Sequence, residues 1–75
     1  MDEYLKDVIY FHRKKARLSR NELADLASVG KTVIYDLEKG KLTVSWQVVI
    51  KVLHALNIKI EFTSPLMKKF LEENK

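Results

Sequence analysis

The chain contains no cysteine, so neither a disulfide framework nor a thiolate metal site can form. It also lacks a signal peptide and any apolar run that approaches membrane-spanning length, and we therefore expect a cytoplasmic protein with no membrane partner. Paired carboxylates suited to acid–base chemistry, a nucleophile with a neighbouring base and a phosphate-binding loop are all missing from the sequence. These absences predict that the protein is not an enzyme and uses no cofactor.

Length and charge limit the remaining possibilities. The 75 residues suffice for one small domain, whose core is marginal in size unless copies of the chain associate. Apolar residues make up 47% of the chain, which argues against disorder although 32% of the residues are charged. The net charge of +4 favours a polyanionic partner such as a nucleic acid.

Residues 2–16 are expected to form the first helix, because apolar side chains recur there at helical spacing. His12 lies on the same stripe as Leu5, Val8 and Ile9, where a histidine can be either a packed residue or a metal ligand. No second histidine, cysteine or acid is placed to share a metal with it. We therefore interpret His12 as packed and expect no metal site.

Two short helical patterns follow, joined by only three residues. The first begins at Ser19, and Glu22 three residues later completes the spacing of a capping box. The second ends at Gly40, a typical C-terminal stop. Such a short link predicts that the two helices cross steeply, with Ala24 small enough to lie at the contact. The apolar residues at helical spacing are Leu23, Ala24 and Ala27 in the first pattern and Val33, Ile34 and Leu37 in the second.

The outer face of the second helix carries side chains suited to duplex DNA. Lys31 can donate to guanine, and Thr32 can bond to a base or touch a thymine methyl group. Asp36 either accepts from cytosine or excludes wrong sequences by its charge. Tyr35 can contact a base, a phosphate or a sugar. We take these four residues as the candidate base-reading set.

Other polar residues around this helix pair are candidates for phosphate contacts. Arg20 follows the N-cap of the first helix, beside free amides and the positive end of the helix dipole. Lys14 and Lys15 could belong either to this contact surface or to a merely solvated charged face. The candidate phosphate-binding residues are Arg20, Asn21, Lys39, Lys41 and Thr43.

The helix pair resembles the helix-turn-helix of the Cro and phage-repressor-type regulators, the xenobiotic-response-element family. The resemblance implies a mainly α, repressor-like DNA-binding domain of four to five helices over residues 1–57, and a buried ion pair between Arg13 and Glu38. Ser28 departs from the family's usual glycine at a turn that tends to need positive φ, and Gly30 from its polar N-cap. The phased set comprises Leu18-Ser19, Glu22-Leu23-Ala24, Ala27, Val29, Ile34, Leu37-Glu38, Gly40-Lys41, Leu53 and Ala55-Leu56.

Residues 58–75 form a separate segment, predicted to serve dimerisation. Ile58, Ile60 and Phe62 alternate with charged residues, as in a β-strand. No second strand pattern exists, so we expect antiparallel pairing with the same strand of a second copy across a two-fold axis. Lys59 would then face Glu61 of the other copy.

Two further features accompany this segment. Trp46, on the broad apolar face of an expected fourth helix, could be a core residue, a dimer contact or a stacking platform for a base. Ser64-Pro65 predicts the start of a short fifth helix, whose apolar stripe needs a partner.

The run Val52–Phe62 resembles the C-terminal half of HipB-like antitoxins. This resemblance implies a homodimer that represses its own operon at an inverted-repeat operator on the bacterial nucleoid, with a HipA-like kinase toxin as its partner. A phage-type repressor without a toxin and a protein-interaction adaptor that has lost DNA binding are the alternatives.

Overall fold

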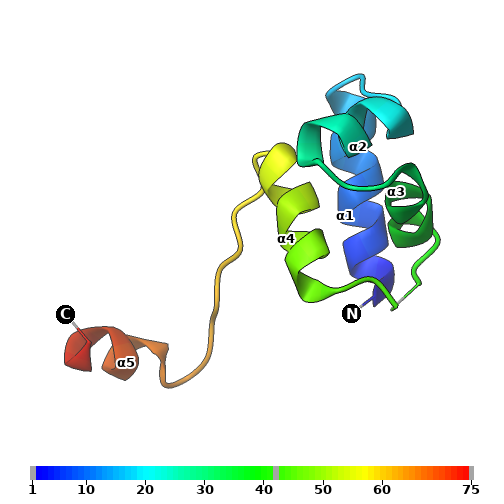
Figure 1. The fold of residues 1–75 in the computed structure, drawn as a ribbon. Helices are drawn as coiled ribbons and strands as arrows, with labels where there is room; N and C mark the ends of the chain where they lie inside the picture. Colours follow the sequence, from blue (N-terminus) through cyan, green and yellow to red (C-terminus); the bar gives the residue numbers. More distant parts are fainter. Residues whose placement is uncertain (1, 42, 75) are drawn as a thin grey trace.

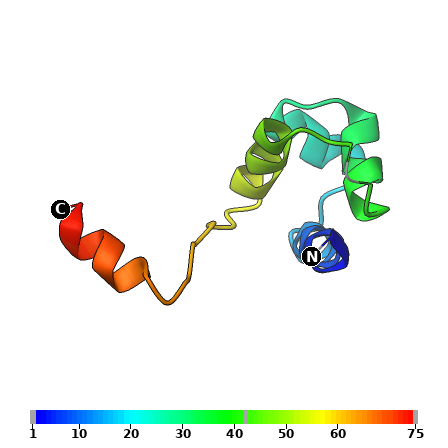
Figure 2. The same ribbon diagram turned by 90° about the horizontal axis from the view of Figure 1, so that it is seen from below.

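The computed structural model describes residues 2–41 and 43–74, which form five helices (Figure 1). Four of them pack together, and the fifth lies apart at the end of an extended segment in both views (Figures 1 and 2). The mainly α fold class is therefore confirmed. The helices are α1 (Asp2–Lys15), α2 (Arg20–Ala27), α3 (Lys31–Glu38), α4 (Trp46–Ala55) and α5 (Met67–Glu73).

One apolar core holds α1 to α4 together. Ala24 of α2 is completely buried, and α2 packs against both α3 and α4 while α1 packs against α3. A small residue at this position lets the helices approach closely, as predicted. Each large side chain buried around it stabilises the fold by about 1.5–3 kcal/mol. The fully buried large residues are Ile9, Leu23, Ile34 and Val52, one from each of the four helices.

The same hydrogen-bonded turn ends each of these four helices. After α2, Ser28 adopts φ 58°, so the turn keeps a positive φ although a serine replaces the family's usual glycine. The amide of Val29 then donates to the carbonyl of Ala24 at 3.0 Å, which is the Schellman arrangement. A side chain in this left-handed conformation costs about 1–2 kcal/mol. The corresponding residues after α1, α3 and α4 are Arg17, Gly40 and Asn57.

Side-chain caps fix the starts of two helices. At α2 the predicted capping box is present: the Glu22 amide donates to Ser19 Oγ at 3.0 Å, and the Ser19 amide donates to Glu22 Oε1 at 2.8 Å. At α4, Ser45 Oγ accepts from the Val48 amide at 3.3 Å. Gly30 starts α3 without a side-chain cap. These ends position α2 and α3 relative to each other, and the predicted start of α4 is confirmed.

The tail differs from its prediction in two ways. Residues 58–64 are extended, but the described ranges 2–41 and 43–74 contain no paired strand, so the pairing between copies stays a prediction. The fifth helix begins at Met67, two residues later than predicted, because the Met67 amide donates to the Ser64 carbonyl at 3.2 Å and closes a turn there.

The first helix ends at Lys15, one residue earlier than predicted. No helix in the described parts is long and apolar enough to cross a bilayer.

Candidate nucleic-acid interface

The third helix turns one face to the core and the opposite face outward. Ile34 and Leu37 are buried, whereas Lys31 and Thr32 are exposed and Tyr35 is 46% exposed. Lys31 and Tyr35 are separated by one helical turn and so lie on the same side. Three of the four predicted base-reading residues therefore share one accessible face.

A polar hollow of about 560 Å³ lies beside this face, where α1, α2 and α3 meet. We call it the basic hollow, because four cationic and no acidic side chains occur among the described residues that line it. Such a charge distribution attracts a polyanion. Its lining comprises Tyr10, Arg13, Lys14, Ser19, Arg20, Asn21, Lys31, Thr32 and Tyr35.

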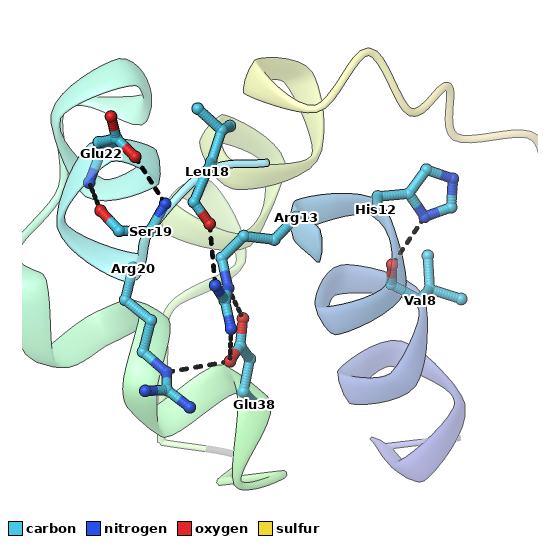
Figure 3. A network of polar contacts seen from close by, with 8 residues as sticks. All are labelled: Val8, His12, Arg13, Leu18, Ser19, Arg20, Glu22 and Glu38. Carbon is cyan, nitrogen blue, oxygen red and sulfur yellow. Dashed lines mark hydrogen bonds and ion pairs between the residues drawn. The ribbon is translucent and has the colours of Figure 1, made fainter. Parts of the chain in front are cut away.

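Arg13, which lines the basic hollow, forms an ion pair with Glu38 of α3 (Figure 3). Arg13 Nε donates to Glu38 Oε2 at 2.6 Å and Nη2 donates to Oε1 at 3.0 Å, while Nη1 donates to the Leu18 carbonyl at 2.9 Å. The hydrogen bonds to Glu38 raise the pKa of Arg13 above its ordinary value, although burial opposes them. The guanidinium thus stays charged, and the bidentate pair ties α1 to the end of α3.

Glu38 also binds a second arginine, which the sequence did not predict. Arg20 Nε donates to Glu38 Oε1 at 3.1 Å, and the side chain of Arg20 remains 48% exposed. This contact uses Nε of Arg20 and neither of its two terminal nitrogens (Figure 3). The bond orients the guanidinium while leaving its outer edge accessible, so Arg20 keeps the geometry that a phosphate contact needs.

Tyr35 lies between two candidate phosphate-binding residues. Its ring centroid is 5.7 Å from Cζ of Arg20 and 5.1 Å from Nζ of Lys39. At these distances a tyrosine ring attracts each cation. Tyr35 therefore brings Arg20, near the start of α2, and Lys39, at the end of α3, close to one ring.

Two comparisons with known proteins agree with this geometry. A helix-turn-helix family model matches residues 9–62, most of the chain. An uncharacterised HTH-type transcriptional regulator of Sinorhizobium fredii, y4mF, is 42% identical over 53 residues, which is 71% of this chain and 70% of that protein. The chain belongs to the helix-turn-helix family of Cro and phage-repressor-type regulators. The third helix is accordingly the second helix of the motif.

The other predicted contacts of the helix-turn-helix lie at the far end of α3. Asp36 is partly buried, and its Oδ1 lies 3.4 Å from Nζ of Lys41. Thr43 is exposed in the loop beyond. Neither these three nor Lys39 is among the described residues that line the basic hollow. The predicted set thus divides into a hollow group of five, which includes Asn21, and a group of four from Asp36 to Thr43.

Sequence reasoning did not place Tyr10 in the hollow and left the role of Lys14 open. Tyr10 and Lys14 of α1 line it together with the motif's own residues. Tyr10 is 47% exposed, so about half of its surface remains accessible at the hollow. The available signal was the spacing of Tyr10 to Arg13 and Lys14, which places three side chains on one helical surface.

A second, apolar hollow of about 390 Å³ lies between α1, α4 and the start of the tail. Trp46, Ile58 and Ile60 line it. Trp46 is 59% exposed, so its interpretation as a core residue of a single chain is wrong. Phe62 is 72% exposed and is not among the described residues that line this hollow. The predicted dimerisation residues therefore gather only in part.

His12 packs as expected. Its Nδ1 donates to the Val8 carbonyl at 2.7 Å, which satisfies one ring nitrogen (Figure 3). Within the ranges that the structure covers, no three histidine, cysteine, aspartate or glutamate residues gather closely enough to hold a metal ion.

Proposed function

We propose that this helix-turn-helix protein is a sequence-specific DNA-binding repressor that inserts α3 into the major groove. The proposal depends on one observation: the exposed face of α3 at Lys31–Tyr35 forms part of the wall of the basic hollow. A helix whose outer face reads base edges and whose flanks hold cations for the phosphates meets the two requirements of specific binding. The protein would act on the nucleoid, in the cytoplasm.

The proposed contacts divide by chemistry. Lys31 and Thr32, at the N-terminal end of α3, read base edges. Arg20, Asn21, Lys39, Lys41 and Thr43 contact phosphates. Asp36 lies at the limit of the reading surface, because its Oδ1 is paired with Lys41 while its other oxygen remains able to accept from cytosine.

The regulator would bind as a homodimer on an inverted repeat, with two α3 helices about 34 Å apart. The apolar hollow and the alternating segment at 58–62 support this assembly. Exposed apolar surface next to an unpaired extended segment is what a shared antiparallel strand would cover. The contacts would centre on Trp46, Ile58, Ile60 and Phe62.

Selection of duplexes from a random-sequence pool, followed by affinity measurements at several salt concentrations, tests DNA binding. We expect an enriched inverted repeat, bound with an affinity that falls steeply as salt rises. Lys31→Ala or Thr32→Ala should change the enriched sequence, whereas Arg20→Ala should weaken all sequences alike. Failure to enrich any sequence over random DNA would favour an adaptor that has lost DNA binding.

We further propose that the repressor is the autoregulating antitoxin of a HipA-like kinase toxin. Two features support this role. One is the resemblance of Val52–Phe62 to HipB-like antitoxins, and the other is the apolar stripe at α5, where Leu66 just before the helix and Phe70 and Leu71 within it are exposed. The neighbouring genes decide the matter. A kinase-like reading frame whose product co-purifies with this protein would support the proposal, whereas no such neighbour would indicate a phage-type repressor.

A further inference from the structure

Two neighbouring lysines on α1 have the same chemistry and different surroundings. Lys14 lines the basic hollow, and its Nζ lies 6.0 Å from the ring centroid of Tyr10. The Nζ of Lys15 lies 5.5 Å from the ring of Phe11, and Lys15 is not among the described residues that line the hollow. Both side chains are exposed, so accessibility alone does not distinguish them.

A chain of contacts connects Lys14 to the end of the third helix. The Cζ of Arg13 lies 5.4 Å from the Tyr10 centroid, so one ring contacts both cations. Arg13 is itself fixed to Glu38 of α3 by two hydrogen bonds. The position of Lys14 is therefore coupled to α3, the helix proposed to enter the groove. Lys15 contacts the ring of Phe11, which is not paired with Arg13 among the cation–ring contacts of the described residues.

We propose, resting on the DNA-binding function above, that the last turn of α1 forms a third wall of the DNA interface. Lys14 binds a backbone phosphate beside the bases that Lys31 and Thr32 read, and Tyr10 is the positioning residue that holds Lys14 over the hollow. Lys15 lies outside the footprint.

Charge and shape favour a phosphodiester backbone as the occupant. Lys14, Arg20 and Lys31 come from three different helices and surround one hollow. A duplex carries a negative charge about every 1.7 Å along its axis. When its major groove receives α3, the adjoining backbone runs past the flanks of that helix, where this hollow opens.

The test compares Lys14→Ala with Lys15→Ala, two exposed substitutions that remove the same charge from adjacent positions. The probe is a fluorescein-labelled duplex of about 30 base pairs, selected by the full-length wild-type protein. Affinity is measured by anisotropy from about 0.05 to 0.3 M salt. Lys14→Ala should make the slope of log K against log salt shallower by about 0.9 and weaken binding about eightfold near 0.1 M salt. Lys15→Ala should change affinity less than about twofold, and circular dichroism should show both variants folded.

Substitutions at Tyr10 test its positioning role. Tyr10→Phe keeps the ring and should retain the wild-type salt slope, whereas Tyr10→Ala should weaken binding. Tyr10→Ala combined with Lys14→Ala should bind no more weakly than Lys14→Ala alone, because the tyrosine acts through the lysine.

The outcomes separate this inference from the proposed function. If the wild-type protein enriches no sequence, the DNA-binding proposal itself fails. If the wild-type protein binds and both lysine variants behave alike, only the role of α1 is overturned. Additive losses at Tyr10 and Lys14 would likewise reject the positioning role of Tyr10.

Discussion

The helical domain at residues 2–57 and the tail at residues 58–74 both contain apolar side chains at regular spacing, but the domain buries them far more completely. Four of its large residues are fully buried, whereas four apolar residues of the tail are 53% to 72% exposed. Burying such a side chain stabilises a fold by about 1.5–3 kcal/mol, a gain the tail lacks in a single chain. The domain is therefore organised by contacts within one chain, whereas we propose that a second molecule covers the apolar residues of the tail. The four exposed tail residues are Phe62, Leu66, Phe70 and Leu71.

The ion pairs of the two regions repeat this contrast. Arg13 and Glu38 form a pair in the domain with side chains 7% and 4% exposed. Lys69 and Glu73 in α5 lie 4.0 Å apart with side chains 73% and 62% exposed. Burial removes water that would otherwise solvate an isolated charge, so loss of one partner is costly only in the domain.

The largest expected effect comes from removing one acid from each pair. Glu38→Ala leaves Arg13 buried without its carboxylate and should lower the free energy of unfolding by about 3–5 kcal/mol. Glu73→Ala should change it by less than about 0.5 kcal/mol, because an exposed pair is solvated in either state. Urea denaturation measures both values.

A double variant provides the control for that comparison. Arg13→Met together with Glu38→Leu removes both charges, so no buried ion is left unpaired. Its loss in free energy of unfolding should be smaller than the sum of the losses caused by Arg13→Met alone and Glu38→Leu alone. Equal losses for Glu38→Ala and Glu73→Ala would contradict the distinction between the regions.

The second effect concerns assembly and is expected only from the tail. Ile60→Asp places two aspartates opposite each other at the proposed two-fold axis, and like charges there oppose pairing. Sedimentation velocity should show monomers in place of dimers. The helical content by circular dichroism should be unchanged, because Ile60 lies outside the helices of the domain.

A charge exchange at the same strand gives a sharper control. Lys59→Glu should weaken the dimer, because the substituted side chain would then face the like charge of Glu61 in the other copy. Exchanging both charges, Lys59→Glu with Glu61→Lys, should restore it. A dimer that is indifferent to all these changes would refute the shared strand.

Sequence signals predicted the domain well because they are local. The capping box of Ser19 and Glu22 and the helical period around Ile34 each depend on residues a few positions apart. The pairing of Arg13 with Glu38 was available through the family resemblance. Chain order and local pattern were therefore enough to predict α2, α3 and the exposed face of α3.

The remaining features depend on how distant segments meet. Arg20 contacts Glu38 across 18 positions, a contact that depends on the angle between α2 and α3. The joining of Tyr10 with Lys31 in one hollow likewise requires α1 to pack beside α3. The alternating pattern of 58–62 predicts a strand, but that strand can form only if another chain pairs with it. A single sequence cannot show whether such a partner exists.

The third prediction separates binding from folding within the domain itself. Tyr35→Leu removes the ring between Arg20 and Lys39, and each contact of this kind contributes about 0.5–1 kcal/mol at an exposed site. DNA affinity should fall roughly fivefold, and the loss of the two contacts should lower the free energy of unfolding by no more than about 1–2 kcal/mol, so the variant stays folded. Tyr35→Phe keeps the ring and should bind like the wild type. A loss in Tyr35→Phe as large as in Tyr35→Leu would instead assign the role to the hydroxyl group, as in a direct contact with DNA.

The smallest effect should strengthen the domain and leave the tail unchanged. Ser28 holds φ 58° at the turn between α2 and α3, where glycine adopts the same conformation without steric cost. Ser28→Gly should raise the free energy of unfolding by about 0.5–1 kcal/mol in urea titrations, whereas Ser28→Ala should give no such gain. Asn57→Gly should stabilise less, because asparagine tolerates the left-handed region better than serine. Since the turn lies far along the chain from residue 60, the dimer dissociation constant of Ser28→Gly should equal that of the wild-type protein. A changed dissociation constant would mean that the two regions are energetically coupled.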